Sequence, residues 1–188
     1  MAIKIFIDQG HNPRNPNAGA EGNGLYEQDI TYEVGVQLAD LLRANPNFEV
    51  RLSRNSPDEI LGTSIGTSLK ARTDAANNWG ADAFISIHAN ASNIESASGN
   101  EGYAYSQSSQ GFPLGENILV GLTESTGLPS RGMFVRPSLY VLRRTKMPAV
   151  LIELGFITNP GDAALMSERP DLFATGMYNG ILSYYGLN

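Results

Sequence analysis

The only two histidines of this sequence and one of its glutamates each follow or end a short apolar run. The runs begin at Ile3, Ala83 and Ala149, and the polar residues are His11, His88 and Glu153. Hydrolytic zinc sites commonly use two His and one Glu as ligands, leave one position for water, and use a further carboxylate as base. Because the chain contains no cysteine, any metal must be held by His, Asp or Glu. With a second glutamate nearby, these residues would form a zinc-dependent hydrolytic centre.

A second carboxylate can come from the segment that follows the first apolar run. Glu27 lies in the first turn of a predicted helix, and helices that follow parallel strands begin at the edge where those strands end. A glutamate in a first turn also commonly does no more than meet the helix dipole. Spacing alone does not separate Glu27 from Glu21, so this position of the site stays open.

Each of these residues also has an ordinary structural interpretation. A lone histidine at the start of a loop is usually solvated or structural. Glu153 is less ordinary, because a carboxylate at the end of an apolar strand is costly to bury unless it has a partner or a task. Arg72, on the helix expected before the His88 strand, is a candidate for binding a substrate carboxylate, although a structural ion pair is the commoner role.

Hydrophobic periodicity predicts the elements that carry these residues. We expect strands at 3–8, 48–54, 83–88, 102–106, 140–143 and 149–153, with the 48–54 strand near the sheet edge. Helices are expected at 27–45, 68–79, 113–125 and 171–185, and loops at 12–24 and 55–67. Alternation of strands and helices is typical of an α/β fold. We therefore predict a mostly parallel twisted sheet of about six strands, with helices on both faces and the three apolar strands ending at one edge.

Length and charge limit the classes of protein. The 188 residues suit a single domain, 1–188, and the net charge of -6 argues against nucleic acid or an anionic membrane surface as a partner. No run reaches the length of a membrane span, and the opening segment is too short for a signal peptide. We expect a monomer without membrane contact.

Several segments resemble a known family when they are taken together and in order. They are Ile7–His11, Gly24–Asp29, Leu69–Arg72 with Ala76–Asn77, Ser86–Asn90, and Met147–Phe156 with Asn159. On these segments the whole chain resembles the catalytic domain of the zinc-dependent N-acetylmuramoyl-L-alanine amidases, the Amidase_3 family. The family usually has Gly-Gly after its first histidine, where this chain has Asn12 and Pro13, and Pro is common where this chain has Gln9.

The resemblance implies roles for the candidate residues. It implies that His11, Glu27 and His88 bind one Zn²⁺ per chain, which also selects Glu27 over Glu21, and that Glu153 is the catalytic carboxylate. It implies cleavage of the amide between N-acetylmuramic acid and L-alanine in peptidoglycan. Arg72 and Asn90 lie in matching segments and are candidate substrate contacts.

The resemblance also suggests where the chain acts and which functions compete. Action at the cell wall is expected, although the chain as given carries no export signal. The short connection after His88 resembles open-cleft members, such as sporulation, germination or phage lysis amidases, rather than cell-division members with an occluding insertion. The alternatives are a non-catalytic peptidoglycan-binding module and a zinc carboxypeptidase that acts on the stem peptide.

Overall fold

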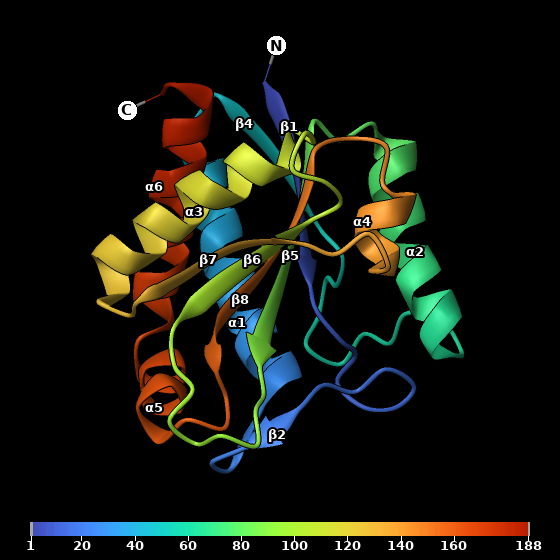
Figure 1. Ribbon diagram of the computed structural model, residues 1–188. Coiled ribbons are helices and arrows are strands. Elements are labelled where there is room, and N and C mark those ends of the chain that lie inside the picture. Colours follow the sequence, from blue (N-terminus) through green and yellow to red (C-terminus); the bar gives the residue numbers. More distant parts are fainter. Residues whose placement is uncertain (1, 188) are drawn as a thin grey trace.

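A six-stranded sheet forms the centre of the computed structural model, which describes residues 2–187 (Figure 1). The strand order is β4-β1-β5-β8-β6-β7. The bounds are β1 Ile3–Gln9, β4 Phe48–Leu52, β5 Ala83–Asn90, β6 Asn100–Ala104, β7 Ser130–Val135 and β8 Ala149–Phe156. Every pair is parallel except β6 with β8, which is antiparallel. The predicted α/β class with a mostly parallel sheet is confirmed, and β4 lies at an edge as expected.

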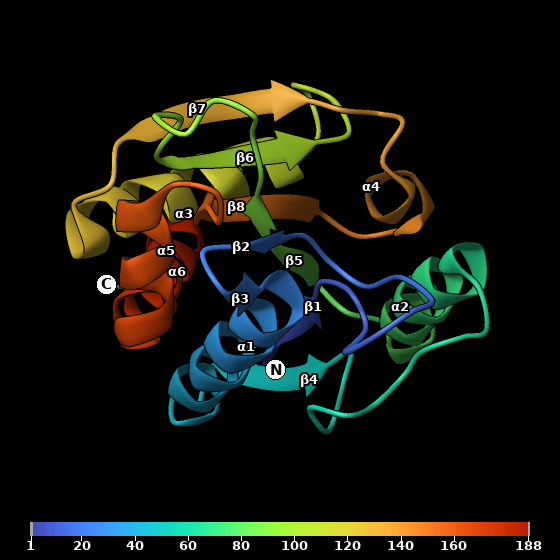
Figure 2. The same cartoon turned by 90° about the horizontal axis from the view of Figure 1, so that it is seen from below.

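Helices cover both faces of the sheet, as predicted (Figure 2). One face carries α1 Glu27–Arg43, α3 Gly111–Thr126, α5 Pro160–Glu168 and α6 Pro170–Tyr185, and the other carries α2 Ile65–Trp79 and α4 Tyr140–Arg144. Alternate strand side chains point to opposite faces. Ile5 and Ile7 of β1 therefore join the larger core under α1, while Phe6 joins the smaller core under α2 and α4. No helix within residues 2–187 combines the length and the apolar character that crossing a membrane requires.

The strand expected at 140–143 is wrong, because this segment is the short helix α4. Its adjacent residues Val141 and Leu142 are both buried on the same side of the sheet, whereas a strand would point them to opposite faces. The Arg143 N–H also donates to the Leu139 carbonyl at 3.1 Å, as in a helical turn. An apolar run this short does not distinguish a helical turn from a strand.

Several element boundaries also differ from the expectation. Helix α2 begins at Ile65, three residues early, because the Ser64 hydroxyl accepts from the Thr67 N–H and the Thr67 hydroxyl bonds back to Ser64. Strand β6 begins at Asn100 rather than at 102. Strand β7, helix α5 and a small hairpin of β2 (Glu21–Gly22) and β3 (Leu25–Tyr26) were not predicted. Hydrophobic periodicity does not reveal β7, because none of its residues is fully buried and its burial does not alternate along the strand.

The strands that carry the candidate residues run side by side in the middle of the sheet. β1 pairs with β5 and β5 pairs with β8, both in parallel, so their carboxyl ends share one edge. His11 follows the end of β1. His88 lies two residues before the end of β5 and Glu153 three residues before the end of β8, so both strands run slightly beyond their expected ends, and the two residues are direct neighbours in register. The prediction that these three residues meet at one edge is confirmed.

Candidate metal centre and active site

Three side chains meet at the carboxyl edge of the sheet with the atoms that a metal would require. Nitrogens of His11 and His88 and an oxygen of Glu27 all lie within 4.8 Å of one another. Glu27 Oε1 lies 2.9 Å from His88 Nδ1 and 3.1 Å from His11 Nε2. The imidazole rings are 4.8 Å apart, edge to face. Glu21, the alternative carboxylate, is exposed on the hairpin and is not part of this group.

The backbone before His11 passes close to the ring of His88. A Cβ atom on Gly10 would lie 2.6 Å from His88 Cε1 and 2.6 Å from the carbonyl oxygen of Ile87, so only glycine fits here without a shift. His11 itself has φ 67°, in the left-handed region, where His occurs more often than most residues. These two features turn the chain sharply at the end of β1 and bring the two imidazoles together.

Asn12, where the sequence departs from the family pattern, holds the loop after His11. Its side chain is fully buried, donates to the carbonyls of Pro16 and Leu61, and accepts from the Leu61 N–H at 3.1 Å. Asn12 Oδ1 also accepts from Arg72 at 3.1 Å. The asparagine thus provides side-chain bonds that tie the loop to its neighbours.

Glu27 is positioned by backbone donors as well as by the histidines. The N–H of Ala20 donates to Oε2 at 2.8 Å and the N–H of Ala89 donates to Oε1 at 3.1 Å. Burial alone would raise the pKa of Glu27, but hydrogen bonds from His11 and His88 outweigh it and lower the pKa well below its usual range. Glu27 is therefore an anion across the physiological range, as a metal ligand must be.

Arg72 is part of an ion pair beneath the site. Its side chain is 1% exposed, and Nη1 donates to Asp8 Oδ1 at 2.7 Å. The guanidinium also donates to the carbonyls of Gln9 and His11. The structural ion pair, which was the alternative to a substrate contact, is what the structure contains. A substrate contact by Arg72 would require this network to break, so we correct that expectation.

Glu153 points to the same face as His88 but makes no hydrogen bond through Oε2, which is buried. Burial is the largest cause that raises the pKa of Glu153 far above its usual value, and the negative charges of Glu27 and Glu101 raise it further. A raised pKa makes the Glu153 carboxylate a stronger base than an ordinary glutamate, so that it accepts a proton more readily. This is the property that a general base in a hydrolytic site needs.

Glu101 is a buried residue near the site that the sequence argument missed. It lies on β6 directly opposite Glu153 and accepts hydrogen bonds from Asn90, Tyr103 and Arg131. Glu101 directly precedes the strand expected at 102–106, and this position was the one available sign of its role. The expected boundary left Glu101 outside the strand. Asn90 donates its amide to Glu101 at 2.7 Å and accepts from the Ala91 N–H, so a substrate contact by Asn90 stays a prediction.

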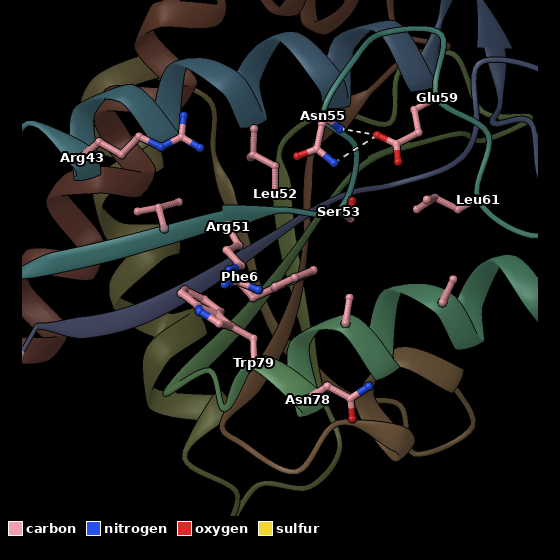
Figure 3. A pocket seen from close by; sticks show the side chains of 13 residues that line it. Phe6, Arg43, Arg51, Leu52, Ser53, Asn55, Glu59, Leu61, Asn78 and Trp79 are labelled. Carbon is pink, nitrogen blue, oxygen red and sulfur yellow. Dashed lines mark hydrogen bonds between the residues drawn. The ribbon is translucent and has the colours of Figure 1, made fainter.

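A large surface groove lies away from these residues. This groove of about 840 Å³ follows the free edge of β4, between Arg51, Trp79 and the loop with Asn55 and Glu59 (Figure 3). It contains none of the titratable groups gathered around Glu27. A smaller cavity of about 130 Å³ is lined by His11 and His88. The smaller cavity is the candidate site, because the residues that line it have the chemistry of a metal centre and those of the larger groove do not.

Comparison with known proteins agrees with the arrangement of these residues. The profile of the Amidase_3 family, described as N-acetylmuramoyl-L-alanine amidase, matches residues 5–183. The chain belongs to this family. The prediction from the five sequence segments, that the resemblance covers the whole chain, is therefore confirmed.

Individual Amidase_3 relatives match the chain over nearly its full length. The N-acetylmuramoyl-L-alanine amidase LytC of Bacillus subtilis is 35% identical over 185 residues, which cover 96% of this chain and 35% of LytC. CwlM of Bacillus licheniformis, also named an N-acetylmuramoyl-L-alanine amidase, is 35% identical, with 99% of this chain and 70% of CwlM covered. The chain thus spans about a third of the length of LytC and about two thirds of that of CwlM.

A solved amidase structure shares the Amidase_3 fold seen here. The N-acetylmuramoyl-L-alanine amidase from Clostridium difficile 630 superposes with a TM-score of 0.87 at 31% identity, covering 98% of this chain and 97% of that chain. The agreement over both whole chains indicates that the six-stranded sheet with its two helical layers is the catalytic-domain fold of the family.

Proposed function

We propose that this chain is a zinc-dependent peptidoglycan hydrolase that cleaves the amide between N-acetylmuramic acid and L-alanine of the stem peptide. The observation that carries the proposal is the meeting of His11, Glu27 and His88 beside Glu153, within a chain of the amidase family. Peptidoglycan lies in the cell wall, so we propose the wall as the place of action. That the protein acts as a monomer stays a prediction.

The donor set fits zinc. Two imidazole nitrogens and one carboxylate oxygen converge on one point, which is the ligand set of many hydrolytic zinc sites. The nitrogens face the same carboxylate oxygen at 2.9 and 3.1 Å, and within residues 2–187 no other basic side chain forms an ion pair with it. A zinc ion held by these residues would lower the pKa of water and polarise a carbonyl group. We expect one ion per chain, because residues 2–187 contain one such group of side chains.

Glu153 would act as the general base and then as the general acid. Its carboxylate takes the proton of the attacking water and returns it to the amine of the leaving stem peptide. The raised pKa suits both steps, since the same carboxyl must accept and release one proton in each turnover. Glu27 cannot share this role, because its pKa is lowered and both its oxygens already accept hydrogen bonds.

Two competing functions differ in their products. A binding module would retain peptidoglycan without releasing any fragment, and Glu153 would then have no purpose in its buried position. A zinc carboxypeptidase would release single amino acids from the far end of the stem peptide. The family membership favours the amidase over both.

Mass spectrometry of digested peptidoglycan tests the proposal. Purified sacculi treated with the zinc-loaded protein should release free stem peptides that begin at L-alanine, and the glycan strands should keep intact lactyl carboxylates. Treatment with a chelator should stop the release, and zinc should restore it. Release of terminal amino acids alone would identify a carboxypeptidase, and retention without any soluble product would identify a binding module.

A further inference from the structure

Arg131 occupies an unusual position in the sheet. Asn100 pairs with Ser130, whereas the next residue of β6, Glu101, pairs with Gly132, so Arg131 is the extra residue of a β-bulge. Gly132 has φ 92°, a conformation that glycine adopts without strain. Bulges are uncommon between parallel strands, occur at sheet edges and near active sites, and change the direction of a side chain. This bulge turns Arg131 toward Glu101.

The guanidinium group of Arg131 is fixed from one side only. Its Nε donates to Glu101 Oε2 at 2.7 Å, and its central carbon lies 5.0 Å from the centre of the Phe156 ring. The side chain of Glu101 is 8% exposed, while that of Arg131 is 42% exposed. Within residues 2–187 neither terminal nitrogen of Arg131 has a hydrogen-bond acceptor. The two terminal nitrogens, which commonly donate a pair of hydrogen bonds to one carboxylate, are therefore oriented and free.

Strand register places this free fork near Glu153, at the same edge of the sheet. His88, Glu153 and Glu101 lie opposite one another across β5, β8 and β6, on one face of the sheet. β7, which carries Arg131, is the next strand beyond β6 (Figure 2). Neighbouring strands are about 4.8 Å apart, so β7 lies roughly 10 Å from Glu153. Two extended peptide residues span about 7 Å, and the arginine side chain reaches back toward Glu101.

We propose that Arg131 binds a free carboxylate of the stem peptide, on the second residue after the scissile amide. The inference rests on the proposed function, because it takes the stem peptide as substrate. A planar guanidinium with two free nitrogens matches a carboxylate better than a hydroxyl or an amide. In peptidoglycan, L-alanine is followed by a D-glutamate linked through its side chain, which leaves the α-carboxyl of that residue free unless it is amidated.

Glu101 is a positioning residue in this arrangement. It does not touch the substrate, but it holds Nε of Arg131 and is itself held by Asn90 and Tyr103. A guanidinium that is already oriented loses less conformational freedom when it binds a ligand. The network that runs from Asn90 to Arg131 thus prepares the receptor before the substrate arrives.

Two soluble muramyl dipeptides that differ in one group test the inference. One carries the free α-carboxyl on the second residue and the other carries the primary amide in its place. With the zinc-loaded protein, Arg131→Ala should raise KM for the acid substrate about 10-fold, consistent with a lost hydrogen bond to a charged group. KM for the amide and kcat for both should change less than about two-fold. Arg131→Lys keeps the charge without the fork and should recover only part of the loss for the acid.

Arg51→Ala provides a matched control. Arg51 is also an exposed strand arginine over an aromatic ring, at 4.9 Å from the ring centre of Trp79, but it lies on β4 at the opposite edge of the sheet (Figure 3). This variant changes the net charge equally and should leave both KM values unchanged. An equal rise of KM for acid and amide in Arg131→Ala, or no rise for either, would overturn the inference.

The outcome for Arg131 is separable from the outcome for the proposed function. Release of the dipeptide from either substrate by the unaltered protein supports the amidase activity, whatever Arg131 does. If neither substrate is cleaved, calorimetric titration with the acid dipeptide still tests Arg131. Binding that weakens about 10-fold in Arg131→Ala and is unchanged in Arg51→Ala supports the carboxylate receptor, and equal binding by all three proteins contradicts it.

Discussion

Replacing Glu153 with glutamine separates proton transfer from metal binding. The side chain keeps its shape and its place beside His88, and no hydrogen bond through Oε2 is lost because Oε2 makes none. The variant removes only the capacity to take up a proton. If Glu153 is the general base, kcat should fall by about 10²- to 10⁴-fold, which corresponds to about 3–5 kcal/mol of the activation free energy. Zinc content should remain at one ion per chain.

Glu153→Gln should lower the activity but raise the stability of the metal-free protein. Burial and the charges of Glu27 and Glu101 raise the pKa of Glu153 in the folded state above its value in the unfolded chain. The stability that protonated Glu153 contributes is therefore present at low pH and is lost as the pH rises through the folded-state pKa. Glutamine cannot ionise, so Glu153→Gln should raise the free energy of unfolding at neutral pH and above. Urea unfolding of both proteins with a chelator, from pH 5 to 8, measures this difference.

Glu27→Gln is the matched control, because it makes the same chemical change in the other glutamate. Both oxygens of Glu27 accept backbone hydrogen bonds, and Oε1 lies against both imidazoles. A neutral amide there should bind zinc poorly, since two imidazoles remain as ligands. Elemental analysis should therefore find zinc well below one equivalent, together with lost activity.

The pair of variants gives a clear refutation. If Glu153→Gln loses its zinc while Glu27→Gln keeps both zinc and activity, the two roles are reversed. If Glu153→Gln retains zinc and more than about a tenth of the activity, Glu153 is not the general base, because the loss is below the range for a positioned base.

Four further variants test the site and its surroundings. His88→Ala should lose zinc and activity together, and full zinc by elemental analysis in that variant would contradict the ligand assignment; His11→Ala should behave alike. Asp8→Asn leaves Arg72 buried without its counter-charge and should cost about 3–5 kcal/mol in urea unfolding at pH 7. Burial would raise the pKa of Asp8, but Arg72 lowers it overall, so the effect of the variant should shrink as the pH falls through the folded-state pKa of Asp8. Glu101→Gln removes a negative charge that raises the pKa of Glu153, so the acid limb of kcat/KM against pH should move to lower pH.

The positions of three of the candidate site residues followed from local sequence patterns. His11, His88 and Glu153 each stand at the end of an apolar run, and runs of that kind become central strands because both faces must be buried. Parallel strands end at one edge, so the convergence of the three side chains could be predicted without knowing any tertiary contact. The layered α/β fold was predictable for the same reason, since the periodicity of strands and helices alternates along the chain.

The choice of Glu27 over Glu21 was not available from spacing. Both lie between β1 and the body of α1, and either is within reach of the strand ends in sequence terms. The hairpin of β2 and β3 leaves Glu21 exposed, whereas the N–H groups of Ala20 and Ala89 hold Glu27 under the two imidazoles. Family resemblance selected Glu27, which the structure places beside both imidazoles, but the physical reason for that placement lies in contacts between distant segments.

The class of fold, the strands that carry the candidate residues and the absence of thiol ligands could be predicted from the sequence, because they depend on composition and on patterns within about ten residues. The folded chain alone shows that β6 runs antiparallel to β8, which sets Glu101 opposite Glu153. It also shows that a bulge in β7 turns Arg131 toward Glu101, and that Arg72 pairs with Asp8. Pairing direction, register and burial are properties of segments far apart in the chain, and a local pattern of residues contains no information about which segment will lie beside it.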